Sequence, residues 1–227
     1  MRKAVVTGHS RGLGEAMAAL LEAEGWVVLG VSRSAGVRVD LSSPGELASW
    51  LDSGDLTAFL GDASEILLIN NAGAVAPMEV AGRQSVGEIA SSVNLNVTAA
   101  MALTDAVLRV RPDGTPVRVV HISSGAARRA YPGWSVYCAT KAALDMHAQV
   151  IASEGHRGVR IAALAPGVVD TAMQAQIRDA EGFPLRDRFV ALNDDGQLTS
   201  VEEAAARVLA LIDAPDFGQR VIADVRD

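Results

Sequence analysis

Short runs of consecutive apolar residues alternate with segments of helical spacing along almost the whole chain. The apolar runs predict strands at residues 3–7, 26–31, 37–39, 66–69, 117–122, 159–164 and 220–223. Strands that are apolar throughout are typical of a parallel sheet covered by helices on both faces. The pattern therefore predicts an α/β fold with one doubly wound parallel sheet of about seven strands.

The segments between these runs carry the predicted helices. They cover residues 15–24, 44–60 with a break near Gly54, 85–109, 135–154 and 200–212. Ser200 and Glu203 form a capping box at the start of the last one. Residues 171–199 are more polar and are predicted to be an excursion with short helices. With no repeat or linker in the sequence, we expect one domain over residues 1–227.

Composition narrows the classes of function. Of the 227 residues 49% are apolar, which suits a folded domain, and the net charge of −7 argues against nucleic acid or an anionic membrane as the main partner. A single cysteine excludes an internal disulfide, and with four dispersed histidines it gives no expectation of a metal site. No apolar run is long enough for a membrane span or a signal-peptide core, so we expect a cytoplasmic protein.

A glycine-rich turn follows the first predicted strand and opens the first helix. Its spacing is Gly8-x-x-x-Gly12-x-Gly14. Glycines there let the backbone approach a pyrophosphate, and the helix N-terminus supplies N–H donors. This unit makes the predicted sheet Rossmann-type, with its ligand beyond the carboxyl ends of the strands. A tight turn without a ligand is the alternative.

The end of the second predicted strand indicates which dinucleotide is preferred. An acidic residue there commonly binds the ribose 2′-hydroxyl of NAD. This chain instead has Ser32-Arg33-Ser34, and Arg11 lies in the glycine turn. Arginine binds phosphate well, so the pattern favours NADP(H) over NAD(H). Asp40, after the third strand, could accept from the adenine amino group or could simply be a turn residue.

A serine, a tyrosine and a lysine are predicted to meet at the same edge of the sheet. Ser124 follows the strand 117–122, and Tyr137 and Lys141 lie four residues apart on one face of the next helix. A phenol beside an ammonium group, with a second hydroxyl donor, is what proton transfer to a carbonyl oxygen needs. Each residue alone has an ordinary structural explanation, so the prediction depends on their joint occurrence.

Six motifs in order make the chain resemble the short-chain dehydrogenase/reductase family over nearly its whole length. The motifs are Thr7-Gly8-His9-Ser10-Arg11-Gly12-Leu13-Gly14, Asn70-Asn71-Ala72-Gly73, Asn94-Leu95-Asn96, Ser124, Tyr137-x-x-x-Lys141 and Pro166-Gly167-Val168-Val169-Asp170-Thr171. The resemblance implies an NADP(H)-dependent oxidoreductase. The cofactor contacts expected from the motifs and from the strand ends are Gly8, Ser10, Arg11, Gly12, Leu13, Gly14, Ser32, Arg33, Asp40, Leu41, Asn71, Ala72, Gly73, Tyr137, Lys141, Pro166, Gly167, Val169 and Thr171.

The same resemblance implies catalytic roles. Tyr137 matches the general acid/base, and Lys141 matches the lysine that lowers the pKa of the tyrosine and binds the nicotinamide ribose. Ser124, rather than Ser123, would bond the substrate oxygen. Asn96 matches the asparagine that anchors a water leading to the lysine, with Asn94 as the alternative.

One subgroup of the family is more similar than the others. Residues 133–146, 166–174 and 217–227 resemble the corresponding stretches of sepiapterin reductases, whose bacterial relatives include reductases of benzil. The resemblance implies reduction of a ketone or vicinal dicarbonyl of a small aromatic or pterin-like substrate. The substrate contacts expected are Ser124, Trp134, Met173, Phe183 and Asp224, although Trp134 could be a packing residue and Asp224 a surface residue.

Two other functions compete with this interpretation. A 3-oxoacyl-carrier-protein reductase would share the same catalytic residues. It would also need a basic patch to bind its acidic carrier protein, and Arg128 and Arg129 form only a small patch of this kind. An NADP(H)-binding regulator without activity would be expected to have lost one of the catalytic residues. The expected partners are a small carbonyl substrate and further copies of the chain, in a homodimer or homotetramer formed through helices near residues 90–110 and 140–155.

Overall fold

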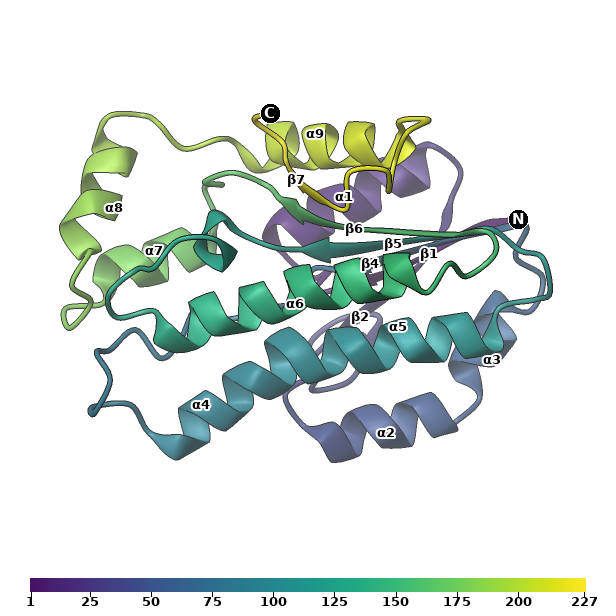
Figure 1. Ribbon diagram of the computed structural model, residues 1–227, viewed down its shortest axis with the longest axis horizontal. Coiled ribbons are helices and arrows are strands. Elements are labelled where there is room, and N and C mark those ends of the chain that lie inside the picture. Colours follow the sequence, from purple (N-terminus) through teal and green to yellow (C-terminus); the bar gives the residue numbers. More distant parts are fainter.

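The computed structural model describes residues 1–227, and its sheet has seven parallel strands in the order β3-β2-β1-β4-β5-β6-β7 (Figure 1). The strands are β1 Arg2–Thr7, β2 Val27–Ser32, β3 Val37–Arg38, β4 Glu65–Asn70, β5 Val117–Ile122, β6 Val159–Ala165 and β7 Ile222–Asp224. The order reverses between β1 and β4, as a doubly wound sheet requires. The predicted fold class is confirmed.

Helices cover both faces of this sheet. They are α1 Gly12–Ala23, α2 Pro44–Asp52, α3 Asp55–Leu60, α4 Val86–Val93, α5 Ala99–Val110, α6 Ser135–Ser153, α7 Ala172–Asp179, α8 Arg186–Asp194 and α9 Val201–Asp213. Figure 1 shows α1 and α9 together above the sheet and α4, α5 and α6 below it. The excursion α7–α8 lies beyond the carboxyl ends of the strands, where a ligand is expected.

Alternation along each strand divides the core into two layers. Val6 on β1 faces one layer, with Met17 of α1 and Val208 of α9. Val5, the next residue back, faces the other layer with Leu103 of α5. These side chains are fully buried, and burial of each stabilises the fold by about 1.5–3 kcal/mol. The central residues of the strands are mostly apolar because neither face of the sheet meets solvent.

The predicted break near Gly54 is confirmed, because the segment 44–60 forms two helices and Gly54 takes a left-handed conformation with φ of 86° between them. Two other predicted elements differ in detail from those observed. The long helix predicted over 85–109 contains a π-helical turn at Asn94–Thr98, between α4 and α5. The last strand is Ile222–Asp224, so Asp224 ends the strand.

The polar stretch 171–199 folds back over the end of the sheet. An isolated bridge between Val169 and Thr199 pairs the two ends of this stretch, and α7 and α8 lie between these residues. Aromatic side chains of the stretch, Phe183 and Phe189, are buried against Trp134 at the start of α6. This packing puts the substrate excursion directly over the expected catalytic residues. None of the helices has the combination of length and apolar character that crossing a membrane requires.

Candidate active site

The three glycines of the turn after β1 cannot be replaced without a clash or backbone strain. A Cβ built on Gly14 would lie 2.3 Å from the carbonyl oxygen of Gly8, and Gly8 and Gly12 both have positive φ, 67° and 55°. A short side chain at any of the three would fill the space or strain the backbone. The turn is therefore a backbone cradle at the N-terminus of α1, which suits a pyrophosphate.

Thr7 and Asn71 hold this cradle against β4. The Thr7 hydroxyl accepts hydrogen bonds from the backbone N–H groups of Asn71 and Ala72, each 2.9 Å long. The amide of Asn71 donates to the carbonyl oxygens of Thr7, at 2.9 Å, and Gly8, at 3.3 Å. Asn71 is thus a support of the glycine turn, which explains why the two motifs occur together.

The loop after β2 contains Arg33, and its serine makes all its hydrogen bonds within the same turn. Arg11 and Arg33 are exposed to solvent. The hydroxyl of Ser32 donates to the carbonyl oxygen of Ala35 at 2.8 Å and accepts from two backbone N–H groups of the same turn. Ser32 therefore shapes the loop, while the guanidinium groups remain free to meet a phosphate.

Asp40 builds a turn and carries a negative charge beside this loop. One carboxylate oxygen accepts from the N–H and the hydroxyl of Ser42, at 2.9 and 2.7 Å. These hydrogen bonds, together with the charge of Arg33, lower the pKa of Asp40. The adjacent Leu41 side chain is buried in the core, so only its backbone can face a ligand.

Ser124, Tyr137 and Lys141 are brought together by β5 and α6. Ser124 follows β5 and caps a short 3₁₀ turn, where its Oγ accepts from the N–H of Ala126 at 3.1 Å and its hydroxyl can still donate toward Tyr137. Lys141 Nζ donates to the carbonyl oxygen of Ile122, the last residue of β5, at 2.7 Å. The same ammonium nitrogen is 5.7 Å from the centre of the Tyr137 ring. The predicted meeting of phenol, ammonium and hydroxyl is present.

Burial dominates the protonation of the two central groups. It raises the pKa of Tyr137 to about 12, against the hydrogen bond with Ser124, which acts in the opposite direction. It lowers the pKa of Lys141 to about 8, and the charge of Asp145 partly offsets this. In the protein alone, desolvation of the phenol therefore outweighs the effects that lower its pKa, and the role of Lys141 in lowering the pKa of Tyr137 stays a prediction. A phenol that keeps its proton is the form needed for a general acid.

Asn96, and not Asn94, faces the catalytic residues. Its buried amide binds both backbone groups of Ala74, at 2.8 Å each, and donates to the Thr140 hydroxyl at 3.1 Å. A Cβ built on Gly73 would lie 3.3 Å from Asn96 Oδ1 and 3.6 Å from Lys141 Nζ. The amide of Asn94 instead donates to the carbonyl oxygen of Ser42. Asn96 therefore joins the π-turn to α6 beside Lys141.

An apolar cluster surrounds the Tyr137 ring. Trp134 stacks on Phe183 with ring centres 4.8 Å apart and tilts against Tyr137 at 5.2 Å. Met173 packs against the same cluster. Next to it, a groove of about 450 Å³ runs between residues 74–78 and α7. The predicted pocket residues Trp134, Met173 and Phe183 belong to the same apolar cluster as the Tyr137 ring, but none of them lines this groove.

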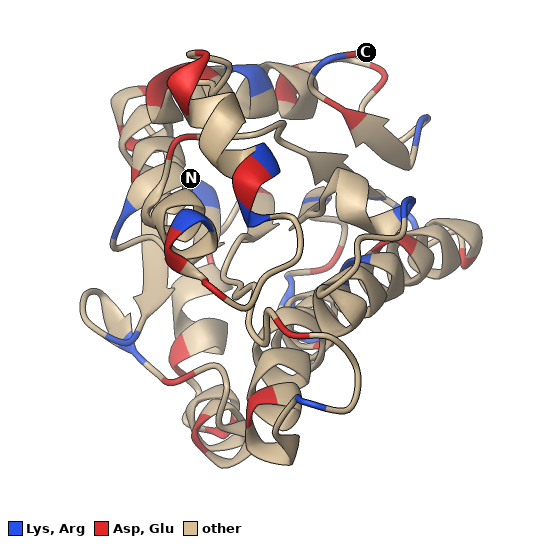
Figure 2. Cartoon of the chain, turned by 90° about the vertical axis from the view of Figure 1, so that its left-hand side faces the viewer, with Lys and Arg blue, Asp and Glu red and all other residues tan.

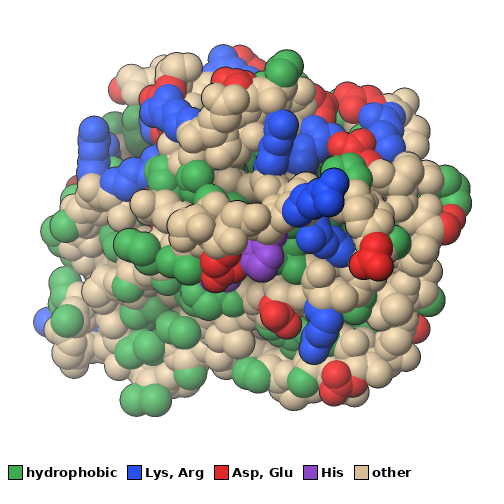
Figure 3. Space-filling model, turned by 45° about the vertical axis from the view of Figure 1, so that its right-hand side comes forward, with side chains coloured by type: hydrophobic (Ala, Val, Ile, Leu, Met, Phe, Trp, Pro, Cys, Tyr) green, Lys and Arg blue, Asp and Glu red, His purple; other side chains and the backbone are tan.

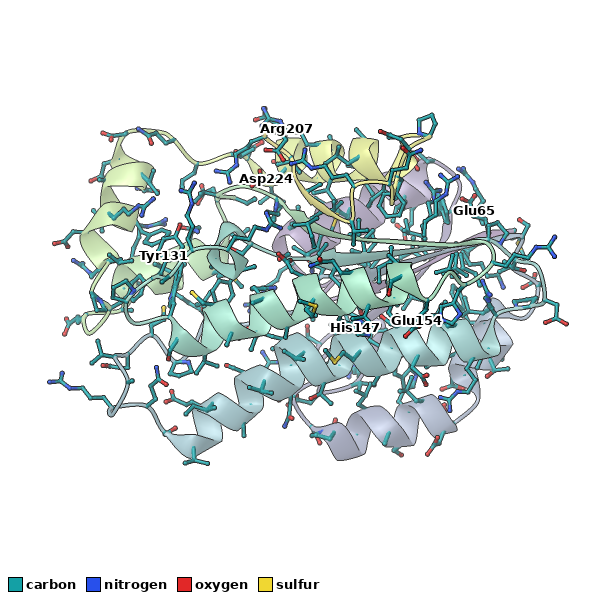
Figure 4. The ribbon with its side chains drawn as sticks, in the orientation of Figure 1. Glu65, Tyr131, His147, Glu154, Arg207 and Asp224 are labelled. Atoms are coloured by element: carbon teal, nitrogen blue, oxygen red, sulfur yellow. The ribbon has the colours of Figure 1, made fainter.

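Asp224 ends β7 and already has a partner. Both of its carboxylate oxygens accept from the guanidinium of Arg226, at 2.7 and 2.6 Å, and the hydrogen bonds lower its pKa. Its side chain is 12% exposed. Figure 4 shows Asp224 and Tyr131 in the same half of the molecule. A substrate group could reach this carboxylate only in competition with Arg226.

The segment 166–171 lies across from the glycine turn. A Cβ on Gly12 would be 3.5 Å from the Thr171 side chain, so the two segments face each other. Thr171 begins α7 without using its hydroxyl as a cap. The bridge to Thr199 uses the carbonyl of Val168 and the N–H of Asp170, and neither bond uses the N–H of Val169. The binding of a nicotinamide carboxamide by Val169 and Thr171 stays a prediction.

Comparison with known proteins identifies the family. The short chain dehydrogenase family matches residues 65–182. A benzil reductase ((S)-benzoin forming) from Bacillus cereus is 36% identical over 96% of this chain and 97% of its own length. The chain belongs to the short-chain dehydrogenase/reductase family. A sepiapterin reductase from Meriones unguiculatus is 34% identical over 98% of this chain and 95% of its own, so the predicted subgroup is also confirmed.

A solved member of the family carries the cofactor. The short chain dehydrogenase from Burkholderia cenocepacia in complex with NADP is 25% identical, with a TM-score of 0.76 over 98% of this chain and 94% of its own. As a short-chain dehydrogenase/reductase, the present chain is an oxidoreductase with a nicotinamide cofactor of the NAD(P) type. The glycine cradle fits that cofactor, since side chains at Gly8 and Gly14 would collide with the backbone.

Sequence reasoning missed three residues that shape this site. Asp145 is buried one helical turn after Lys141, a spacing that could have revealed it. Arg226 is two residues from Asp224, and such neighbours commonly pair. His9 packs against Gly30 and Gly36, and nothing in the sequence connects these positions. The individual roles of the predicted site residues stay predictions.

Proposed function

We propose that this short-chain dehydrogenase/reductase is an NADPH-dependent carbonyl reductase for small aromatic ketones or vicinal dicarbonyls. The observation that carries the proposal is the position of Tyr137, a protonated phenol between Ser124, Lys141 and the aromatic ring of Trp134. An aromatic carbonyl compound could stack on this cluster with its oxygen toward the phenol. The relatives named for reduction of benzil and sepiapterin support the same class of substrate.

The proposed reaction is a balanced two-electron reduction. The reduced cofactor, when bound, supplies a hydride to the carbonyl carbon. Tyr137 gives its proton to the carbonyl oxygen, and the Ser124 hydroxyl donates a hydrogen bond to that oxygen as charge develops on it. The Lys141 ammonium stabilises the phenolate left on Tyr137, which then takes up a proton from solvent. The product is the alcohol.

NADPH is proposed over NADH because of charge. The loop after β2 has no acidic residue to meet a ribose 2′-hydroxyl, and Arg11 and Arg33 are exposed beside it. A 2′-phosphate between two guanidinium groups would gain charge-assisted hydrogen bonds. The NADP complex of the Burkholderia cenocepacia relative supports this choice.

The ion pair between Asp224 and Arg226 favours a dicarbonyl substrate over a pterin substrate. A pterin would use its amino group to bind a free carboxylate, whereas Asp224 is held in a two-point ion pair with Arg226. An uncharged dicarbonyl needs no such anchor. The variant Arg226→Ala would free the carboxylate, and we expect it to raise turnover of sepiapterin relative to benzil.

The competing functions have less support from the site. Arg128, one of the two arginines of the supposed carrier-protein patch, is paired with the buried Asp145, so it is not a free surface charge. The catalytic residues lie together, which an inactive regulator would not need.

The experiment is a substrate panel followed by loss of the reduced cofactor's absorbance. The panel contains benzil, sepiapterin and an acetoacetyl thioester, each with NADPH and NADH. We expect benzil to be reduced with NADPH at the highest kcat/KM. Reduction of the thioester alone, or faster reduction with NADH, would contradict the proposal.

A further inference from the structure

A buried carboxylate behind the catalytic serine has no part in the chemistry described so far. Asp145 lies on α6, four residues after Lys141, and is 6% exposed. Placing a charge in the interior is costly unless it is paired and hydrogen-bonded, so a buried aspartate needs partners. Its two partners both belong to the segment that carries Ser124.

The first partner is the residue next to Ser124. The buried hydroxyl of Ser123 donates to Asp145 Oδ1. The backbone N–H of Ser123 also donates to the carbonyl oxygen of Leu164 on β6, at 2.8 Å. Ser123 is therefore fixed on two sides, by the sheet and by α6.

The second partner follows the 3₁₀ turn. Arg128 Nε donates to Asp145 Oδ2 at 2.9 Å, and the Arg128 side chain is one-third exposed. The carboxylate thus spans the segment 123–128, with one oxygen on each end. Ser124 and the turn Gly125–Ala127 lie between these two points.

We propose that Asp145 is a positioning residue for the reduction, which fixes the Ser124 segment and the Tyr137–Lys141 helix at their working separation. The residues that act on the substrate oxygen come from two elements, and Asp145 joins those two elements directly. A displacement of about 1 Å between reacting groups can lower a rate by about 10²-fold. The inference rests on the proposed function for its effect on turnover.

Asp145 also acts on Lys141 through its charge. The groups that face the ammonium are Tyr137 and Asp145 on its own helix and His121 on β5. Of these, Asp145 favours the charged form of Lys141 and opposes the effect of burial. Removal of the carboxylate charge should therefore lower the pKa of Lys141 further.

The chain offers a direct way to measure this effect, because Lys3 and Lys141 are its only lysines. Labelling with [ε-¹³C]lysine gives two side-chain NMR signals, and a Lys3→Arg background leaves one. In Asp145→Asn we expect the Lys141 signal to titrate about one pH unit lower than in the wild type. The kcat for benzil should fall about 10- to 100-fold, with the alkaline limb of its pH profile moved the same way.

Two further variants separate geometry from charge. Ser123→Ala keeps the carboxylate, so kcat should fall while the titration of Lys141 stays in place. Asp105→Asn removes an exposed carboxylate that pairs with Arg109 on α5, and should change neither measurement. If Asp145→Asn does not fold, Arg128→Gln tests the same clamp from its exposed end, with a lowered kcat expected.

The outcomes distinguish this inference from the proposed function. If the wild type reduces no panel substrate, the proposed function fails, and the NMR titration still tests the action of Asp145 on Lys141. If Asp145→Asn titrates and turns over like the wild type, the positioning role is wrong. If Asp145→Asn does not fold, and Ser123→Ala and Arg128→Gln both leave kcat unchanged, the hydrogen bonds of Asp145 do not position the Ser124 segment and the inference is wrong.

Discussion

Gly30 has no space for a side chain, because the imidazole ring of His9 occupies it. A Cβ on Gly30 would lie 2.2 Å from a ring carbon of His9, and one on Gly36 would lie 2.8 Å from another. His9 belongs to the glycine turn, Gly30 to β2 and Gly36 to the following turn. The ring therefore packs the cofactor cradle against the loop that holds Arg33.

This contact predicts a rescue by a second substitution. Gly30→Ala should destabilise the protein by about 1–3 kcal/mol, since the methyl group must push the ring aside. It should also weaken NADPH binding. The double variant His9→Ala/Gly30→Ala removes the clash and should recover much of both losses. Urea unfolding and NADPH titration check this, and strictly additive effects would show that the two residues do not interact.

Arg33 is predicted to discriminate between the two cofactors. Arg33→Ala should weaken NADPH binding about 10- to 100-fold, the worth of a charge-assisted hydrogen bond, and leave NADH binding nearly unchanged. Fluorescence titration with both cofactors measures it. Arg157→Ala, an exposed arginine between α6 and β6, is the matched control. An equal loss for both cofactors would exclude a phosphate role for Arg33.

At the scale of single residues, motif spacing predicted most of the site but not its supports. Tyr137, Lys141, Ser124 and Asn96 lie together because a motif places their types at fixed positions along known elements. The raised pKa of Tyr137 was not predictable, since it depends on burial by residues far away in the sequence. The pairing of Asp224 likewise depends on the conformation of Arg226.

At the scale of elements, a buried polar chain joins β4, β5 and α6. His121 on β5 is fully buried between the amide of Asn70, 3.2 Å from Nδ1, and His147 on α6, whose Nδ1 is 3.0 Å from Nε2. Figure 4 shows His147 along α6. Thr104 of α5 also lies within hydrogen-bond distance of Asn70. These contacts give His121 a structural role in the core.

Acid should destabilise the fold through this histidine. Burial, with the charges of His147 and Lys141, lowers the pKa of His121 to about 3, while an unfolded chain would have about 6.5. Between these values the unfolded state binds the extra proton, so stability falls as pH falls. His121 alone contributes a slope of about 1.4 kcal/mol per pH unit.

Urea unfolding between pH 7 and pH 4 tests this slope. His121→Gln removes the titrating group and can keep a hydrogen bond. The free energy of unfolding of this variant should therefore change less with pH than that of the wild type, by the slope that the uptake of about one proton on unfolding produces. His147, whose pKa burial also lowers, would still contribute in the same direction. Parallel pH dependence in wild type and variant would contradict the assignment.

Element boundaries were predictable where one residue type decides them. Gly54 ended a helix as expected, and apolar runs located every strand to within a few residues. The π-turn Asn94–Thr98 was not predictable, because nothing in its local sequence indicates one extra residue in a turn. It depends on tertiary bonds that Asn96 makes to Ala74 and Thr140.

At the scale of the whole molecule, charged residues are spread along the chain, whereas exposed apolar residues gather on one face. Figure 2 shows acidic and basic residues interspersed over the chain. In Figure 3 hydrophobic side chains gather on the left of the view, over the helices of the α4–α6 face. Exposed apolar residues on α4 and α6 are Val86, Val93, Met146 and Val150. We propose that this face joins subunits in a homodimer or homotetramer.

A charged residue on this face should separate the subunits. Met146 is 59% exposed, so Met146→Glu should leave the fold intact and shift the protein toward monomers. Leu20→Glu, on α1 at the opposite face, is the matched control and should leave the assembly unchanged. Light scattering after size-exclusion chromatography measures the mass. A monomeric wild type, or equal behaviour of both variants, would contradict the interface.

The most direct test of the whole account is Tyr137→Phe, assayed with benzil and NADPH. The variant keeps the ring that packs on Trp134 and loses only the proton donor. We expect NADPH binding within twofold of the wild type and a kcat about 10³-fold lower, within the usual contribution of general acid catalysis. A kcat close to that of the wild type would show that Tyr137 does not protonate the substrate, and the proposed mechanism would be wrong.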